Sequence, residues 1–376
     1  MEYVDTLEKH RAEPQKSLEA YAKERRVTLG KQLHRCKKIY LDTKYWILLR
    51  NSSMGMETEL SVKNLLDSLE DGVWSGHLIC PIGADIFSEI LRQTDETTLL
   101  KSVSLIDRLS KGMVILFHEE RFPLEVLYFV YKNLLGDSSY YPPDLFVWTK
   151  MAYILGFYTP GKTPFGKEEE LAIQKAFLDQ MWDVSLADMV NVIGVTNFLN
   201  NSPLDFNTDE LNRNKKRFGD KCKSFEEIFL SELANLLDDM KPEFSEMLVF
   251  LSKRFPEFQV TGKAAKTAQS AQWFANLIYH AFRLKRFSTE LPFLNIQASL
   301  HAAIWMDSKR KYKPTDIHDI LHATAALPYF DVFLTERSLT HLLTRTDMAL
   351  DRLYECRVVA KPTEANTEIA RLLAER

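Results

Sequence analysis

Short apolar runs that alternate with helical segments are the feature that most limits what this chain can fold into. Each run has four or five residues, which is the length of a buried strand. The runs occupy residues 38–41, 77–80, 113–117, 331–335 and 356–360. Between them, apolar residues recur at helical spacing, as in Leu99, Val103 and Ile106. Strands that alternate with helices are typical of parallel sheets, so we expect the α/β fold class.

The stretch from 120 to 292 lacks this alternation. Nearly all of it has helical spacing, interrupted at Pro, Gly or Asn, and the expected helices are 123–136, 144–157, 167–182, 225–239, 243–254 and 263–284. We therefore predict a large all-helical insertion. Residues 1–37 are dense in charge and predict a solvated N-terminal helical extension. The expected organisation is an extension at 1–37, a first α/β part at 38–119, the insertion at 120–292 and a second α/β part at 293–376.

Composition excludes several classes of protein. The net charge of −4 argues against a chain that is basic all over, although it allows a local basic patch. The four cysteines include no CxxC pair, which disfavours a sulfur-rich zinc site and is typical of a reducing compartment. The first ten residues are charged where a signal peptide is apolar, and the most apolar window, 146–158, is too short to span a bilayer. We expect a cytoplasmic protein that does not bind membranes.

Acidic residues stand where the expected strands end. Asp42 follows the run 38–41, and Glu336 follows the run 331–335. The carboxyl ends of parallel strands line the ligand crevice of such a sheet. Asp316 and Asp319 share one face of an expected helix, and Glu89 lies at the edge of another helix's apolar face. Each acid alone also fits a structural role, such as capping a helix or facing solvent.

Together these acids predict a cation site. Carboxylates that converge repel one another and have raised pKa values, and a hard divalent ion relieves the repulsion. Mg²⁺ prefers oxygen ligands, and sites of this kind serve phosphoryl transfer. We therefore expect Asp42, Asp316, Asp319 and Glu336 to bind Mg²⁺ or Mn²⁺.

The same residues resemble the PIN-domain nuclease superfamily. The resemblance lies in IYLDTKYWI at 39–47, in FSEIL at 87–91 and in PTDIHDILHATAALPYFDVFLTER at 314–337. It implies a three-layer α/β/α fold around a parallel sheet. It also implies a Mg²⁺- or Mn²⁺-dependent endonuclease that acts on RNA and leaves 5′-phosphate and 3′-hydroxyl ends.

The resemblance also assigns roles to particular residues. It implies that Asp42, Glu89, Asp319 and Glu336 are catalytic, that Asp316 is an accessory acid, and that the hydroxyl of Thr43 contacts the substrate. Two departures stand out. Glu336 is longer than the Asp often found at this position, and the long insertion does not belong to the minimal fold.

Two basic clusters are candidates for contacting RNA. Lys309, Arg310, Lys311 and Lys313 directly precede the acidic helix, so we expect them to bind substrate phosphates. The second cluster lies in NRNKKRFGDKCK at 212–223, where a positive island could grip phosphates or form a solvated loop.

Other functions fit parts of the pattern. His318 and His322 have the HxxxH spacing of a zinc peptidase helix, although Asp319 stands where such enzymes carry Glu. A structure-specific DNA nuclease would share a related fold. An inactive PIN-like protein could instead use the insertion to bind a protein partner or to form an oligomer.

Overall fold

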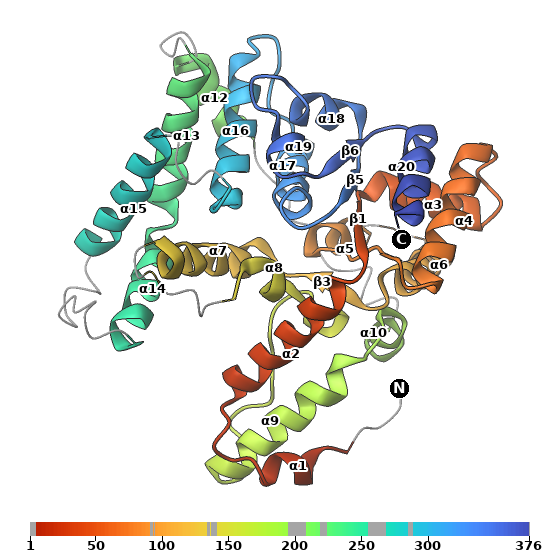
Figure 1. Cartoon of the computed structure of the whole chain (residues 1–376), viewed down its shortest axis with the longest axis vertical. Helices are drawn as coiled ribbons and strands as arrows, with labels where there is room; N and C mark the ends of the chain where they lie inside the picture. Colours follow the sequence, from red (N-terminus) through yellow and green to blue (C-terminus); the bar gives the residue numbers. More distant parts are fainter. Residues whose placement is uncertain are drawn as a thin grey trace.

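The computed structural model covers the whole chain and describes residues 5–90, 93, 95–133, 136, 141–194, 208–218, 224–254, 268–284 and 289–375. It is a mixed α/β structure that is mostly helical, with a small parallel sheet of four strands (Figure 1). This confirms the expected fold class. The three-layer PIN-like arrangement is finer than these elements establish and stays a prediction.

The parallel sheet joins strands from both halves of the chain. Its order is β2 (Leu78–Ile79), β1 (Lys37–Leu41), β5 (Val332–Leu334) and β6 (Arg357–Val359). All three strand pairs are parallel, and Leu41 of β1 is in register with Leu334 of β5. Ile39, Tyr40 and Leu41 are fully buried, as expected for parallel strands covered on both faces.

Around residues 113–157, one sequence expectation holds only in part and another is wrong. The run 113–117 contributes a strand, β3 (Met113–Ile115), as expected, but this strand pairs antiparallel with β4 (Trp148–Lys150) in a separate sheet, and its parallel contact is a single bridge between Val114 and Ile82. The segment 144–157, expected as one helix, consists of α8 (Pro143–Phe146), β4 and a 3₁₀ turn, η1 (Met151–Tyr153). Pairing with β3 buries Trp148 and Thr149, and this tertiary gain outweighs the helical spacing of the segment.

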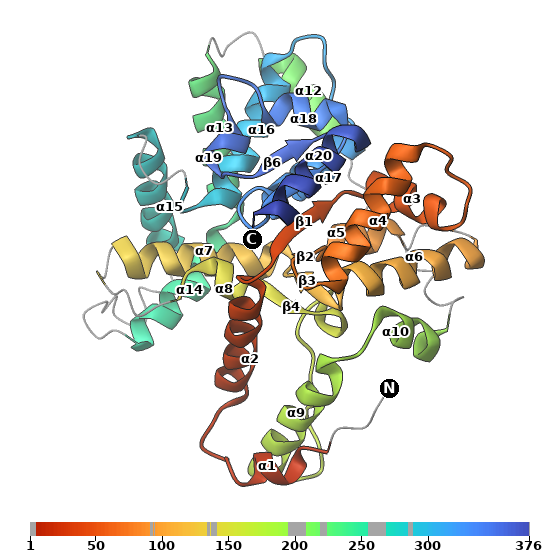
Figure 2. The ribbon, with the colours of Figure 1, turned by 45° about the vertical axis from the view of Figure 1, so that its right-hand side comes forward.

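The remaining helices fall into groups (Figures 1 and 2). One group contains α3 (Thr43–Ser53), α4 (Leu60–Trp74), α6 (Glu96–Ser110) and α20 (Pro362–Ala374). Near the sheet lie α5 (Ala84–Ile90), α16 (Pro292–Met306), α17 (Pro314–Ala326), α18 (Arg337–Leu343) and α19 (Leu350–Leu353). No helix among the described residues is long and apolar enough to cross a membrane.

The N-terminal extension is helical, as expected, but only part of its surface is solvated. Its helices are α1 (Leu7–Arg11) and α2 (Leu18–Leu33), and Tyr21, Leu29 and Leu33 of α2 belong to the main apolar core. The backbone of Gly30 lies against Leu145 of α8 so closely that a side chain there would clash. The charge-rich composition concealed these contacts, because the buried apolar residues of α2 are scattered among charged ones and the buried residue of α1 is His10, which pairs with Asp179 of α9.

The expected insertion divides between two packing units. Its first part, α9 (Lys167–Trp182) and α10 (Leu186–Ile193), packs with the N-terminal helices and the main core. A second core, on the left of Figure 1, joins α7 (His118–Asn133), α13 (Phe225–Asp239), α14 (Lys241–Arg254), α15 (Ala268–Arg283) and the start of α16. In helix α12 (Asp209–Phe218), Leu211 packs against the main core.

Helix α7 ties the second core to the main one through a buried carboxyl. Glu125 is fully buried and accepts hydrogen bonds from Phe293 N at 3.0 Å and from the Tyr329 hydroxyl at 2.7 Å. One turn earlier, Arg121 donates to the Thr324 hydroxyl at 3.3 Å. Burial raises the pKa of Glu125 to about 7, although the two hydrogen bonds and Arg121 act against this rise.

This buried carboxyl makes the stability of the fold depend on pH. Because folded Glu125 keeps its proton up to about pH 7, while an ordinary Glu releases it near 4.5, unfolding releases a proton between these values. Stability therefore falls as the pH rises through this window. We expect Glu125→Gln, which stays neutral, to gain up to about 3 kcal/mol relative to wild type between pH 4.5 and pH 8. Urea unfolding across this range measures the gain, with exposed Glu19→Gln as the control. Parallel profiles for wild type and Glu125→Gln would contradict it.

Candidate active site

The pairing of β1 with β5 sets two acids at the same edge of the sheet. Asp42 directly follows β1 and is the N-cap of α3, where its Oδ1 accepts a hydrogen bond from Tyr45 N at 3.1 Å. Its own backbone N–H donates to Leu334 O of β5 at 3.0 Å. Glu336 follows β5 and is the N-cap residue of α18, with an exposed side chain. The strand ends thus bring together two acids that lie about three hundred positions apart in the sequence.

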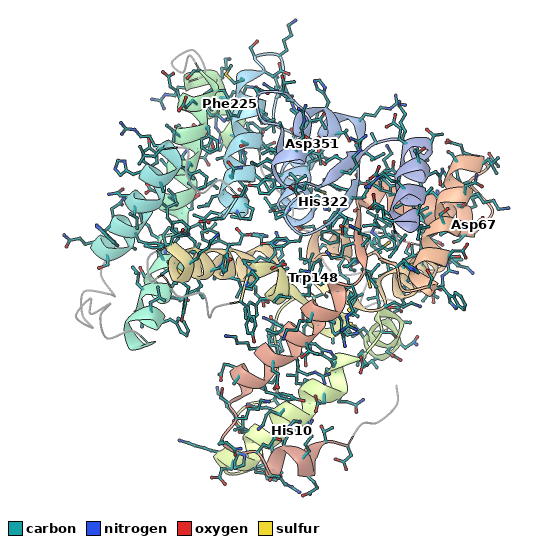
Figure 3. The ribbon with its side chains drawn as sticks, viewed as in Figure 1. His10, Asp67, Trp148, Phe225, His322 and Asp351 are labelled. Atoms are coloured by element: carbon teal, nitrogen blue, oxygen red, sulfur yellow. The ribbon has the colours of Figure 1, made fainter. Side chains whose placement is uncertain are left out.

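Helices α17 and α5 supply the other acids and two histidines. Pro314 is the first residue of α17, a position that suits its fixed φ, and Lys313 is the N-cap. Asp319 and both histidines, His318 and His322, lie within the first three turns of the helix. Glu89 comes from the last turn of α5, which packs against α17. In Figure 3, His322 lies on α17 near the sheet, whereas His10 lies on α1 at the bottom of the view.

One cavity of about 720 Å³ contains all the site residues predicted from the sequence. Its acidic residues are Asp42, Glu89, Asp316, Asp319 and Glu336. Its basic residues include Lys309, Arg310, Lys311 and Lys313, and Thr43 also lines the cavity. The predicted acids and the predicted phosphate contacts therefore face a shared space.

Asp316 has both carboxylate oxygens engaged within the protein. Oδ2 accepts a hydrogen bond from Lys313 N at 2.7 Å, which completes a capping box, and Oδ1 pairs with the guanidinium of Arg310. These contacts favour the structural role for Asp316 over the predicted role of metal ligand. They also fix the side chain of Arg310, which is half-buried, while Lys309, Lys311 and Lys313 are exposed.

Glu89 is held by cationic and hydroxyl partners. Its Oε1 lies 3.3 Å from His318 Nδ1 and 3.6 Å from His322 Nε2, and its Oε2 accepts a hydrogen bond from the Thr43 hydroxyl. On its other side, His322 Nδ1 lies 2.8 Å from the hydroxyl of buried Tyr40. The expectation that the acids converge without cationic partners is therefore wrong for Glu89.

The contact between Glu89 and His322 shifts both pKa values. Burial acts to raise the pKa of Glu89, but the hydrogen bond and charge of His322, together with the Thr43 hydroxyl, outweigh it and lower the pKa to about 2. Burial acts to lower the pKa of His322, but Glu89, with Asp85 and Asp42 behind it, raises the pKa to about 9. At neutral pH the two side chains are a half-buried carboxylate and a buried imidazolium, and the imidazolium donates to Tyr40.

The remaining acids keep a local excess of negative charge. Burial, together with the neighbouring carboxylates of Asp316, Glu336 and Asp42, outweighs the opposing effect of His322 and raises the pKa of Asp319 to about 7. Burial also raises the pKa of Asp42. Within the described part of the chain, no group of three or more His, Cys, Asp or Glu side chains is already arranged around one point as a metal cage. The donors that fit a cation here are carboxylate oxygens, the ligands of Mg²⁺, which is commonly bound by one or two carboxylates and substrate phosphates.

Sequence reasoning missed several residues of this site. Lys44 and Ser338 line the cavity, Tyr40 supports His322 from β1, and Asp85 is buried one turn before Glu89. Lys44 and Ser338 had a usable signal, because each lies within two positions of a predicted site residue. Tyr40 and Asp85 had none, since their roles arise only from contacts between segments distant in sequence.

Replacing His322 tests the buried pair. Because the pKa of His322 is raised, the contribution of its charge to the free energy of unfolding is complete below about pH 6.5 and is lost as the pH rises through about 9. Because the pKa of Glu89 is lowered, the contribution of its charge is complete above about pH 4.5 and is lost as the pH falls through about 2. We expect His322→Gln to be about 3 kcal/mol less stable at pH 6.5 and to lose the fall in stability towards pH 9. Urea unfolding measures both effects, and exposed His77→Gln is the control. If the free energy of unfolding of His322→Gln depended on pH as it does in the wild type, the pairing would be refuted.

Comparisons of the chain with protein-family models, with curated proteins and with solved structures found no match.

Proposed function

We propose that this protein is a metal-dependent endoribonuclease of the PIN type. The observation that carries the proposal is the cavity of about 720 Å³, in which carboxylates from distant parts of the chain face a cluster of exposed lysines. Neither half of this arrangement alone suggests a reaction. A phosphodiester needs cationic groups to bind its negative charge and an acidic site to hold a cation at the scissile phosphate. The cavity offers both within reach of one another.

The division of charge across the cavity supports a nucleic acid strand as substrate. Lys309, Lys311 and Lys313 are exposed on the loop that leads into α17. Within the described part of the chain they form no ion pair with the acids that a phosphate would have to break. Asp42 is only 5% exposed and lies deeper. A strand that crosses the lysines therefore has to turn one phosphate inward to reach Asp42, which favours an unpaired, flexible chain such as single-stranded RNA.

The acids that would hold the cation are Asp42, Asp319 and Glu336. They supply oxygen donors. The pKa of Asp319 is raised first by burial and then by the neighbouring carboxylates, whose negative charge a divalent ion would offset. When bound, Mg²⁺ or Mn²⁺ polarises a phosphate oxygen and provides a nucleophile near neutral pH. Glu89 has another task in this scheme. Its pairing with His322 fixes its orientation, and its contact with the Thr43 hydroxyl fixes the residue next to Asp42.

Substituting Asp42 tests the reaction. Asp42→Asn keeps an oxygen that can accept the hydrogen bond from Tyr45 N, so the start of α3 is preserved while the negative charge is lost. We expect cleavage of single-stranded RNA in Mn²⁺ or Mg²⁺ to be abolished with no loss of stability in urea unfolding. Asp67→Asn, at an exposed position on α4, is the matched control and should retain full activity.

The assay compares RNA, single-stranded DNA and flap DNA, each with and without the metal. Cleavage of RNA alone supports the proposal, and a preference for flap DNA would move the assignment to a structure-specific DNA nuclease. A folded Asp42→Asn protein that still cuts RNA would exclude the proposed site. Wild-type protein that cuts none of these substrates would favour a non-catalytic protein.

Neutralising the lysines tests substrate binding separately from the reaction. The double substitution Lys309→Ala, Lys311→Ala removes two exposed charges and leaves the Arg310–Asp316 pair in place. We expect RNA affinity to fall and the slope of log K against log salt to become shallower by about 1 to 1.5, because fewer counterions are released. Binding titrations in the Asp42→Asn background at several salt concentrations measure both. An unchanged slope would show that these lysines do not contact phosphates.

A further inference from the structure

Side chains of helix α12 form hydrogen bonds with the backbone of the basic loop. This loop, residues 307–313, connects α16 to α17 and carries the exposed lysines of the cavity. Lys215 of α12 reaches across and donates to Ile304 O at 2.6 Å, to Asp307 O at 2.7 Å and to Arg310 O. An ammonium has three donors, and each of them meets one of these carbonyls.

A second residue of the same helix, Asn212, forms hydrogen bonds with the loop backbone at Tyr312. Tyr312 N donates to Asn212 Oδ1 at 2.8 Å, and Asn212 Nδ2 donates to Tyr312 O at 2.9 Å. The Tyr312 ring is itself buried, and its hydroxyl donates to His301 O at 3.2 Å. Asn212 therefore pairs with Tyr312 as a neighbouring strand would, and the backbone between Lys311 and Lys313 is fixed on both sides.

These contacts change the interpretation of the second basic cluster. The sequence alone suggested that residues 212–223 either grip phosphates or form a solvated loop. Lys215 does neither, because its ammonium is used by backbone carbonyls, and residues 219–223 lie outside the described part of the chain. Lys216, the next residue, is exposed. Two adjacent lysines on one helix thus have different surroundings.

Capping of α16 does not account for all of these contacts. Ile304 O belongs to the last turn of α16, and Asp307 is its C-cap residue, so a lysine at these carbonyls is an ordinary C-terminal interaction. Arg310 O and both polar backbone atoms of Tyr312 lie beyond the helix end, in the loop itself. Contacts at these positions constrain the course of the loop rather than the end of the helix.

We propose that Lys215 and Asn212 are positioning residues that set the affinity for RNA by holding loop 307–313 in the orientation that presents its lysines to the cavity. This inference rests on the proposed function. We call the contacts of Lys215 and Asn212 with the loop the clamp. The clamp can be tested separately from its effect on RNA affinity, because the mobility of the loop can be measured without any substrate.

The central comparison is Lys215→Met against Lys216→Met. Both remove one positive charge from the same helix, but only the first removes the three hydrogen bonds to the loop. We expect Lys215→Met to speed amide hydrogen exchange at residues 307–313, which depends on local opening. In the Asp42→Asn background we expect it to weaken RNA binding roughly tenfold and to flatten the salt dependence. In the otherwise wild-type protein, KM should rise with little change in kcat.

Asn212→Ala provides an independent route to the same result. It leaves every charge in place, so weaker RNA binding in this variant cannot come from a lost ionic contact. It also keeps the inference testable if Lys215→Met fails to fold. Lys215→Arg, which retains donors on a long side chain, should recover part of the lost affinity.

The outcomes separate the two proposals. Unchanged exchange at 307–313 in both Lys215→Met and Asn212→Ala would overturn the clamp. Faster exchange with unchanged RNA affinity would overturn its role in binding, as would an equal loss of affinity in Lys215→Met and Lys216→Met. Wild-type protein that neither binds nor cuts RNA would refute the proposed function and this role together, and the exchange data would then show whether α12 holds the loop at all.

Discussion

The parallel pairing of β1 with β5 is the interaction on which the rest of the structure depends. It joins residues near the start of the chain to residues near its end, and in this register Asp42 follows β1 where Thr335 and Glu336 follow β5. A shift by one residue would turn every side chain of β1 to the other face and would move Asp42 away from the edge. The cavity, the acids within it and the orientation of α3 all follow from this one register.

Cationic side chains balance only part of the acidic charge in the cavity. Two of its acids have cationic partners in the protein: Glu89 pairs with His322, and Asp316 pairs with Arg310. Asp42 is buried and Asp319 is half-buried, neither forms an ion pair within the described part of the chain, and burial is the main cause that raises the pKa of each. Neighbouring carboxylates that are shielded from water are costly to keep charged, and binding of a divalent cation would offset that cost.

The sequence revealed the parts of the site that are local and concealed those that are not. Asp42 and Glu336 could be found because an acid after a short apolar run marks a strand end, and Asp319 because the composition of its helix is unusual. The partners of Glu89 could not be found, since His322 lies more than two hundred positions away and reads equally well as part of a zinc motif. The strand β4 was hidden for a related reason: the apolar spacing of 144–157 fits a helix, and only β3 makes it a strand.

The helical part of the chain reaches the site from two directions. Through α7, Arg121 contacts Thr324 on the site helix α17, and Glu125 contacts Tyr329 just beyond its end. Through α12, Lys215 and Asn212 hold the loop that precedes α17. Both ends of α17 are therefore fixed by residues outside the parallel sheet and its own helices. This explains how so large an insertion can accompany a compact site: it adds support to the one helix that carries Asp319, and its outer surfaces remain available without disturbing the acids.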